Sequence, residues 1–203
     1  YLTGVIFMDN AFNEAGEGDM KSLVPFMYGI VLIIMALSLR TFWGTLTTIL
    51  IMAFSILTGM GLAGWSGILL TPISANAPTI ILTLAVADSI HILVTLFYEV
   101  RHGKTKYEAI QESLRVNHQP IFITSLTTAI GFLSLNFSDS PPFRDLGNIV
   151  AVGVMAAYVY SVFFLPAMMA ILPLRVKKVS SSQNIWIDTF GDWVIHNRNL
   201  LFW

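Results

Sequence analysis

The segment ISANAPTIILTLAVADSIHILVTLFYE, which runs from Ile73 to Glu99, determines how the rest of the chain is interpreted. About 20 consecutive apolar residues suffice to cross a bilayer as an α-helix, and this segment is long enough to do so. Near its middle lie three polar side chains, Asp88, Ser89 and His91. A carboxylate at the centre of a bilayer costs about 2.5–3.5 kcal/mol on insertion scales, so an acidic residue at this depth is a functional candidate.

The composition is that of a membrane protein. Of the 203 residues, 55% are hydrophobic and 11% are charged, whereas soluble domains carry about 25% charged residues. The net charge of −1 gives no indication of a nucleic-acid partner. Cysteine is absent from the sequence, which excludes disulfides, thiolate zinc sites and cysteine nucleophiles within it. Because the chain opens on Tyr1 and closes on a new apolar run, we expect it to be a fragment of a longer protein.

The apolar segments predict an all-α membrane protein, a polytopic bundle of five transmembrane helices. The expected spans are residues 22–39, 44–65, 73–99, 121–137 and 146–172. They form one domain, residues 22–172. Before it, residues 1–21 are interpreted as the end of a water-exposed domain and its approach to the membrane. After it, residues 173–203 are interpreted as a linker, an amphipathic helix and the start of the next span.

Between the third and fourth spans, residues 101–118 are interpreted as a separate amphipathic helix on the membrane surface. Tyr107, Ile110 and Leu114 share one face of this helix. The basic residues fix the expected orientation, because cytoplasmic loops carry an excess of lysine and arginine. One side of the membrane receives Arg40, Arg101, Lys104, Lys106, Arg115, Arg175, Lys177, Lys178 and Arg198, and the other only Lys21 and Arg144. The first side is therefore predicted to be cytoplasmic.

Asp88, Ser89 and His91 form the central candidate site. Asp88 and His91 are three residues apart, so they project from nearly one face of a helix. Burial favours the neutral form of a carboxyl group, which allows this pair to take up and relay protons. The structural alternative is a hydrogen-bonded pair that holds helices together. A metal site is disfavoured, because one histidine and one aspartate supply at most half of the ligands.

Two further patterns are weighed beside this site. Hydroxyl residues cluster on the fourth span at Thr124, Ser125, Thr127 and Thr128. In membrane helices such residues usually donate to the carbonyl group four residues back or hydrogen-bond to a neighbouring helix. Some of them can instead face Asp88, and we select Thr128 as the fourth member of a proton relay with Asp88, Ser89 and His91. The segment from Gly59 to Gly64 matches G-x-G-x-x-G, but it ends an apolar span, so close helix packing or a flexible span end is favoured over nucleotide binding.

Several of these segments together resemble the resistance-nodulation-division (RND) superfamily, and within it the MMPL-like predicted exporters and the sterol-sensing-domain relatives such as Patched and Dispatched. The residues that carry the resemblance are ADSIHI (87–92), YEAI (107–110), PIFITSLTTAIGFLS (120–134) and FLPAM (164–168). The opening LTG (2–4) and MDN (8–10) are similar to the end of the family's first periplasmic domain.

This resemblance implies that the five spans correspond to the second to sixth helices of a twelve-helix transporter built from two similar halves. The essential acid of the family would be Asp88, with Ser89 at the place of the tyrosine that MMPL proteins typically carry and His91 as its substitute. The implied function is proton-driven export of hydrophobic or amphipathic compounds, lipids or drugs, across the cell inner membrane. The runner-up is a lipid- or sterol-sensing module that acts through a partner.

The expected partners are membrane lipid, a hydrophobic or amphipathic substrate, protons, the missing second half of the transporter and further copies in a homo-oligomer. Nucleic acid is not among them. The sequence contains no ATP-binding element, nucleophile motif or paired-carboxylate pattern. We therefore expect no enzymatic activity and no cofactor or metal, and the proton gradient is the expected source of work.

Overall fold

The structure, a computed structural model, describes residues 21–39 and 41–173 together with isolated residues outside these ranges. The isolated residues are Gly4, Phe7, Met8, Asn10, Ala11, Glu14, Gly16, Gly18, Trp193 and His196. The helices expected after residue 173 and the water-exposed segment expected before residue 21 therefore lie outside the continuously described part of the chain.

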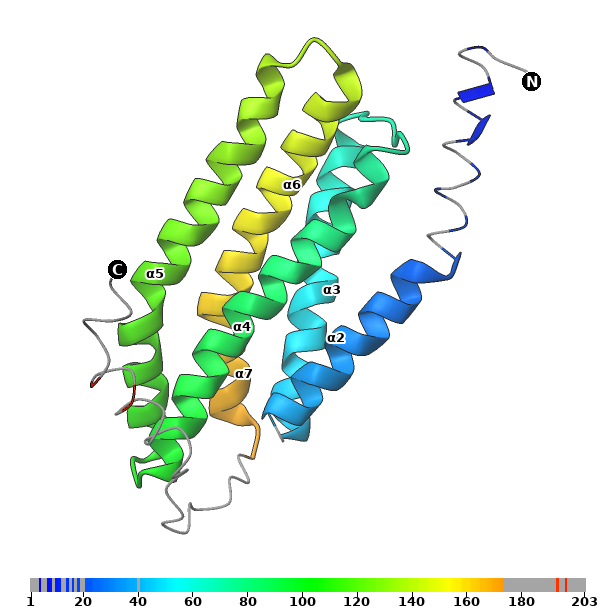
Figure 1. The fold of residues 1–203 in the computed structure, drawn as a ribbon. Helices are drawn as coiled ribbons and strands as arrows, with labels where there is room; N and C mark the ends of the chain where they lie inside the picture. The colour runs from blue at the N-terminus through cyan, green and yellow to red at the C-terminus, as the bar shows by residue number, and fades with distance from the viewer. Residues whose placement is uncertain are drawn as a thin grey trace.

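The continuously described part is a bundle of helices (Figure 1). Its helices are α2 (Leu23–Leu39), α3 (Phe42–Trp65), α4 (Ala77–Arg101), α5 (Lys106–Leu133), α6 (Pro141–Val159) and α7 (Leu165–Ile171). Short 3₁₀ turns, η1 (Ser74–Asn76) and η2 (Ser134–Phe137), precede α4 and follow α5, and a π-helical segment, η3 (Tyr160–Phe164), joins α6 to α7.

Four helical stretches in the described residues are long and apolar enough to cross a membrane, and a shorter apolar one lies in α2. The four are Phe42–Trp65, Ser74–Arg101, Lys106–Phe137 and Pro141–Ile171, and the shorter one is Leu23–Leu37. Within residues 21–39 and 41–173 no residue lies in a β-strand. The prediction of an all-α, multi-pass membrane bundle is therefore confirmed.

From α2 to α6, consecutive helices run in opposite directions, so their connections alternate between two ends of the bundle (Figure 1). We call the end formed by the close of α4 and the start of α5 the basic end, because Arg101, Lys104, Lys106 and Arg115 lie there. The end with the connections at residues 66–76 and 134–140 is the far end. Helix α2 lies at one side of the bundle, where it packs against α3 and α4.

The helices approach one another closely where α3, α4 and α6 cross. A Cβ atom added to Gly153 of α6 would overlap the side chain of Ile81 on α4, and one added to Gly59 of α3 would lie 3.0 Å from the Cδ1 atom of the same isoleucine. Ile81 itself is fully buried. The close-packing interpretation of the glycine-rich segment therefore holds at Gly59, whereas Gly61 and Gly64 face open space.

The segment 101–118 differs from the separate surface helix expected there. Helix α5 begins at Lys106 and continues without interruption through Pro120 to Leu133. Its first half packs on α4 through small side chains, of which Ala109 and Ser113 are buried. The Ser113 hydroxyl donates to the Ile92 carbonyl of α4 at 2.6 Å. These tertiary contacts hold the polar half of α5 in line with its apolar half, which the amphipathic pattern alone did not indicate.

The start of α6 also lies earlier than expected. Pro141 and Pro142, which lie between the predicted spans 121–137 and 146–172, form the first turn of α6. The missing N–H group of proline does no harm there, because the first N–H groups of a helix have no partner within the helix. Helix α6 consequently extends farther toward the far end than the predicted span 146–172.

Candidate functional site: the buried carboxyl group on α4

Asp88 is buried in the middle of α4. It lies eleven residues after Ala77, the first residue of the helix, which corresponds to about 17 Å along the axis. Only 4% of its surface is exposed. The hydroxyl group of Ser125 on α5 donates a hydrogen bond to the Asp88 carboxylate oxygen Oδ2 at 3.3 Å. The structure thus places one acidic group, held by one neutral donor, about halfway along a helix long enough to span a bilayer.

Ser89, the next residue, points toward a different helical segment. Its hydroxyl oxygen lies 3.5 Å from that of Ser161 in η3, and both side chains are fully buried. Successive residues of α4 therefore contact two partners, α5 through Asp88 and η3 through Ser89. Any shift of α4 relative to either partner changes the surroundings of the carboxyl group.

The π-helical segment η3 follows from the position of Pro166. A proline has no N–H group, so the carbonyl group four residues before it, that of Val162, loses its usual α-helical donor. The chain widens one turn earlier, where the Leu165 N–H group donates to the Tyr160 carbonyl, five residues back. Single π turns of this kind are frequent at functional sites. The regular α-helix is thus interrupted before Pro166 by a widened turn.

Helix α3 supports the same segment. The hydroxyl groups of Tyr160 and Thr58 lie 3.0 Å apart, and the Phe54 ring packs against the rings of Tyr160 and Phe164 at 5.9 and 5.6 Å between centroids. The widened turn is therefore fixed by α3 at Tyr160 and by α4 at Ser161.

The structure brings together only some of the residues selected from the sequence. Asp88 and Ser89 are buried within the bundle, whereas His91 is exposed on the surface of α4 and Thr128 is half-buried on α5. The hydroxyl group bonded to Asp88 is that of Ser125, one helical turn before Thr128. The assignment of all four residues to a proton relay stays a prediction.

The described residues contain no group of three or more histidine, cysteine, aspartate or glutamate side chains that could hold a metal ion. Within this part of the chain, the site contains one carboxyl group and several hydroxyl groups. Such a set binds and releases protons and forms hydrogen bonds that change with the charge of the carboxyl group.

Comparison with known proteins identifies the family. The model of the MMPL family matches residues 1–194 of this sequence. The chain belongs to the MMPL family. This assignment confirms the resemblance inferred from the segments around Asp88, Pro120 and Pro166, and together with the apolar helices it makes the chain part of a multi-pass membrane protein.

Individual relatives are distant, and this chain covers a small part of each. "Probable transport protein MmpL12" of Mycobacterium tuberculosis is 25% identical over 181 residues, which cover 86% of this chain and 16% of that protein. "Putative membrane protein MJ1562" of Methanocaldococcus jannaschii is 26% identical over 141 residues, 70% of this chain and 36% of that protein. "Protein dispatched homolog 3" of Gallus gallus is 26% identical over 95 residues, 47% of this chain and 7% of that protein.

Three residues around the buried carboxyl group of Asp88 were not selected from the sequence. Ser125 belonged to a recognised hydroxyl cluster, but the spacing within a cluster does not show which member faces the acid. Ser161 and Tyr160 lie in an apolar span as isolated polar residues. The one available signal was their position five and six residues before Pro166, where a helix is expected to depart from regular α-helical geometry.

Proposed function

We propose that this chain is part of a proton-driven transporter that moves hydrophobic or amphipathic compounds, such as lipids or drugs, out of the cell. Asp88 is the group that takes up and releases the proton. The observation that carries this proposal is a carboxyl group that is 4% exposed, lies midway along a membrane-spanning helix and has a neutral serine donor as its hydrogen-bond partner. Intramembrane acids of this kind are costly to insert and commonly serve in proton relays.

The family assignment supports transport, because the relative MmpL12 is named a probable transport protein. The contacts around Asp88 support a coupling between its protonation and the packing of the helices. Ionisation of the carboxyl group strengthens its bond with Ser125, and protonation weakens it. Because the adjacent Ser89 contacts the widened turn at Ser161, a change in the α4–α5 contact is transmitted to η3 and α7. Each proton moved across the membrane supplies about 2.3 kcal/mol per 100 mV, so no nucleotide is required.

We further propose that the basic end faces the cytoplasm, as the excess of lysine and arginine at this end indicates. The resemblance to the RND superfamily supports the further proposal that the protein lies in the cell inner membrane. Substrate selection then falls mainly to parts of the protein outside this chain. Those parts include the second half of the transporter and its outward-facing domains, and the complete protein assembles as a homo-oligomer.

The experiment that tests this function uses the full-length protein in lipid vesicles. The movement of a fluorescent lipid analogue is followed with and without an imposed pH gradient, in the wild type and in the Asp88→Asn and Asp139→Asn variants. Asp139 is a matched control, since it is an exposed aspartate in the loop at the far end. We expect gradient-driven movement in the wild type and Asp139→Asn and none in Asp88→Asn. Movement that does not depend on the gradient contradicts the proposal.

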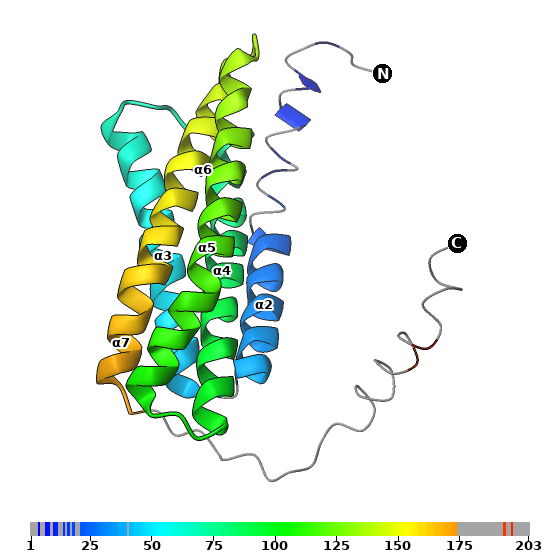
Figure 2. The same ribbon diagram turned by 90° about the vertical axis from the view of Figure 1, so that its left-hand side faces the viewer.

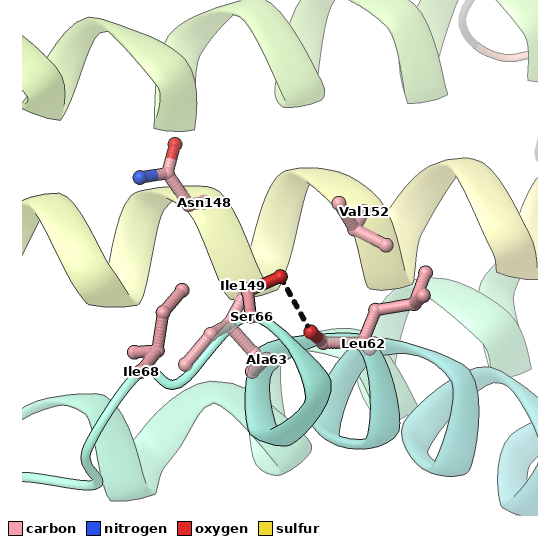
Figure 3. Close-up of a pocket in the computed structure, with 8 residues that line it drawn as sticks. Leu62, Ala63, Ser66, Ile68, Asn148, Ile149 and Val152 are labelled. Atoms are coloured by element: carbon pink, nitrogen blue, oxygen red, sulfur yellow. Dashed lines mark hydrogen bonds between the residues drawn. The ribbon is translucent and has the colours of Figure 1, made fainter.

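The second candidate function is a lipid- or sterol-sensing module. A shallow pocket at the far end, between α3 and α6, is the observation that favours it. The pocket has a volume of about 100 Å³ and is lined by Gly59, Leu62, Ala63, Ser66, Ile68, Asn148, Ile149 and Val152 (Figure 3). Sites for small molecules usually enclose about 300–1,000 Å³, so this pocket holds only part of a lipid chain. Binding of the lipid analogue without gradient-driven movement, in the same vesicles, would favour this function.

A further inference from the structure

The pocket between α3 and α6 begins where the backbones of these two helices touch. A Cβ atom added to Gly59 of α3 would lie 3.2 Å from the Gly153 Cα atom and 3.3 Å from the Ile149 carbonyl oxygen, both on α6. A side chain therefore has no room between the helices at this point. From here the pocket, of about 100 Å³, extends toward the far end (Figure 3).

The other end of the pocket is bounded by Ile68, which the end of α3 holds in place. Gly67 has a φ of +75°, the left-handed conformation that commonly closes a helix C-terminus. The Gly67 N–H group donates to the Gly64 carbonyl at 3.1 Å, and the Ile68 N–H group donates to the Ala63 carbonyl at 3.0 Å. These two bonds form a helix cap that fixes the backbone at Ile68. The pocket thus has a defined length, from the backbone contact at Gly59 to this cap.

The residues that line this pocket carry no charge, and most of them are apolar. The apolar walls are formed by Leu62, Ala63, Ile68, Ile149 and Val152. Ala63 and Ile149 are buried, whereas Leu62 and Val152 are 42% and 39% exposed, so a molecule can enter on their side. A charged group placed here would lose its hydration without gaining a partner. The lining therefore favours uncharged, apolar groups.

Two polar residues, Ser66 and Asn148, also line the pocket. The Ser66 hydroxyl donates to the Leu62 carbonyl at 2.8 Å, so its proton is used while its oxygen can accept a further hydrogen bond (Figure 3). The Asn148 amide is paired with that of Asn136 in η2, since the Nδ2 atom of each donates to the Oδ1 atom of the other at 3.1 and 2.9 Å. The Ser66 oxygen is therefore the acceptor that the pocket offers to a bound molecule.

The size and the depth of the pocket restrict the ligand further. An engineered apolar cavity of about 150 Å³ in another protein takes up benzene or xenon, whereas sites for drug-sized ligands enclose about 300–1,000 Å³. A pocket of about 100 Å³ therefore has room for a short alkyl chain. Trp65, which is 87% exposed at the end of α3, is typical of the membrane interface. Ser66 thus lies near the interface, and Gly59, seven residues earlier, lies about 10 Å deeper.

We propose that this pocket binds a free, uncharged amphiphile with a short alkyl chain, such as hexanol. The hydroxyl group of the ligand donates to the Ser66 oxygen near the interface, and its chain lies against Leu62 and Val152 and extends toward Gly59. Atoms that line an unfilled space lack dispersion contacts, so the bound chain strengthens the packing of α3 against α6. A phospholipid, with a charged headgroup and two long chains, fits neither the lining nor the length of the pocket. This binding does not depend on the proposed transport function.

The test measures the protection of single cysteines in the full-length protein, reconstituted in phosphatidylcholine vesicles. This chain contains no cysteine, so only cysteines elsewhere in the protein need replacement. Val152→Cys and Leu62→Cys each place a thiol in the pocket. Their matched controls are Val159→Cys and Leu57→Cys, which change exposed residues of the same two helices that do not line the pocket. Each thiol is modified with a small neutral thiosulfonate, alone and in the presence of hexanol, hexadecanol or hexanoate.

We expect hexanol to slow the modification of both pocket variants, by roughly tenfold at about ten times its dissociation constant, and to leave both controls unchanged. Hexadecanol and hexanoate should give no protection. Equal slowing in the pocket variants and their controls, or no slowing in the pocket variants, overturns the proposal. Equal protection by hexadecanol would show that any membrane chain fills the pocket, and equal protection by hexanoate that charge is tolerated; either result also overturns it. The two pocket variants lie on different helices, so one of them decides the test if the other misfolds.

A further variant tests the contact of the ligand's hydroxyl group. Ser66→Ala, made in the Val152→Cys protein, removes the acceptor and leaves the apolar walls in place. Half-maximal protection should then require about two- to tenfold more hexanol, which is the change expected for the loss of one hydrogen bond. An unchanged requirement would refute the contact with Ser66 and, with it, the orientation assigned to the ligand.

Discussion

Lys106 holds the end of α7 against the start of α5, and its removal should loosen that end. Its ammonium group Nζ donates to the carbonyl oxygens of Ala170 at 2.5 Å and Leu172 at 2.8 Å. These carbonyls belong to the last turn of α7, where no further N–H group of the helix reaches them. Figure 2 shows α7 continuing the line of α6 to the basic end, beside the first turns of α5. Replacement by methionine keeps the length of the side chain and removes the donors.

The expected size of the effect follows from these two bonds. A hydrogen bond from a charged group contributes about 1.5–3 kcal/mol, and we take the value of one such bond for the pair because the site is partly exposed to solvent. A loss of 1.4 kcal/mol corresponds to about a tenfold change in an equilibrium constant. In Lys106→Met, local opening of α7 should therefore become about 10- to 150-fold more frequent.

Hydrogen exchange followed by mass spectrometry on the full-length protein measures this opening, in peptides that cover residues 165–172. Lys104→Met is the control, because the Lys104 side chain is 41% exposed and pairs with Glu99 rather than with α7. We expect faster exchange in α7 for Lys106→Met and unchanged exchange for Lys104→Met. The same exchange rate in both variants would refute the role assigned to Lys106.

Two further predictions concern packing and the site. Gly153→Val forces a side chain against Ile81, so we expect the free energy of unfolding to fall by about 1–3 kcal/mol and the thermal midpoint in detergent to fall with it. Gly61→Val is the control, because its side chain meets no atom within 4 Å and should leave the midpoint unchanged. An unchanged midpoint in Gly153→Val would contradict the close crossing. Ser125→Ala removes the hydrogen bond to Asp88 and should slow gradient-driven transport about tenfold. Thr124→Ala should not slow it, because the Thr124 hydroxyl donates within its own helix. Equal transport rates in these two variants would exclude Ser125 from the site.

The sequence predicted the helices well where apolar length decides the structure. Residues 44–65 and 73–99 were expected as spans and correspond to α3 and α4. It predicted poorly where contacts between helices override the local pattern. The segment 106–118 is polar enough to lie on a membrane surface, but Ser113 and Ala109 pack it against α4 and make it part of α5. Such contacts join residues that are far apart in the sequence.

The sequence likewise predicted only part of the candidate site. Asp88 follows from the cost of an acid within a span, which is a property of one residue and its apolar neighbours. The choice between Ser125 and Thr128 as its donor depends on the rotation of α5 about its axis, which the hydroxyl spacing does not determine. The contact of Ser89 with Ser161 lies in the widened turn before Pro166, and the sequence does not show which residue of that turn faces α4.

The central claim, that Asp88 carries the transported proton, is tested most directly by proton flux through the full-length protein in vesicles with an imposed pH gradient. Internal pH is followed with a fluorescent dye in the wild type, Asp88→Asn and Asp88→Glu, after checking that each variant inserts and folds. We expect flux to be lost in Asp88→Asn, which cannot ionise, and partly retained in Asp88→Glu, which can. Wild-type flux in Asp88→Asn would remove Asp88 from the proton path and contradict the account.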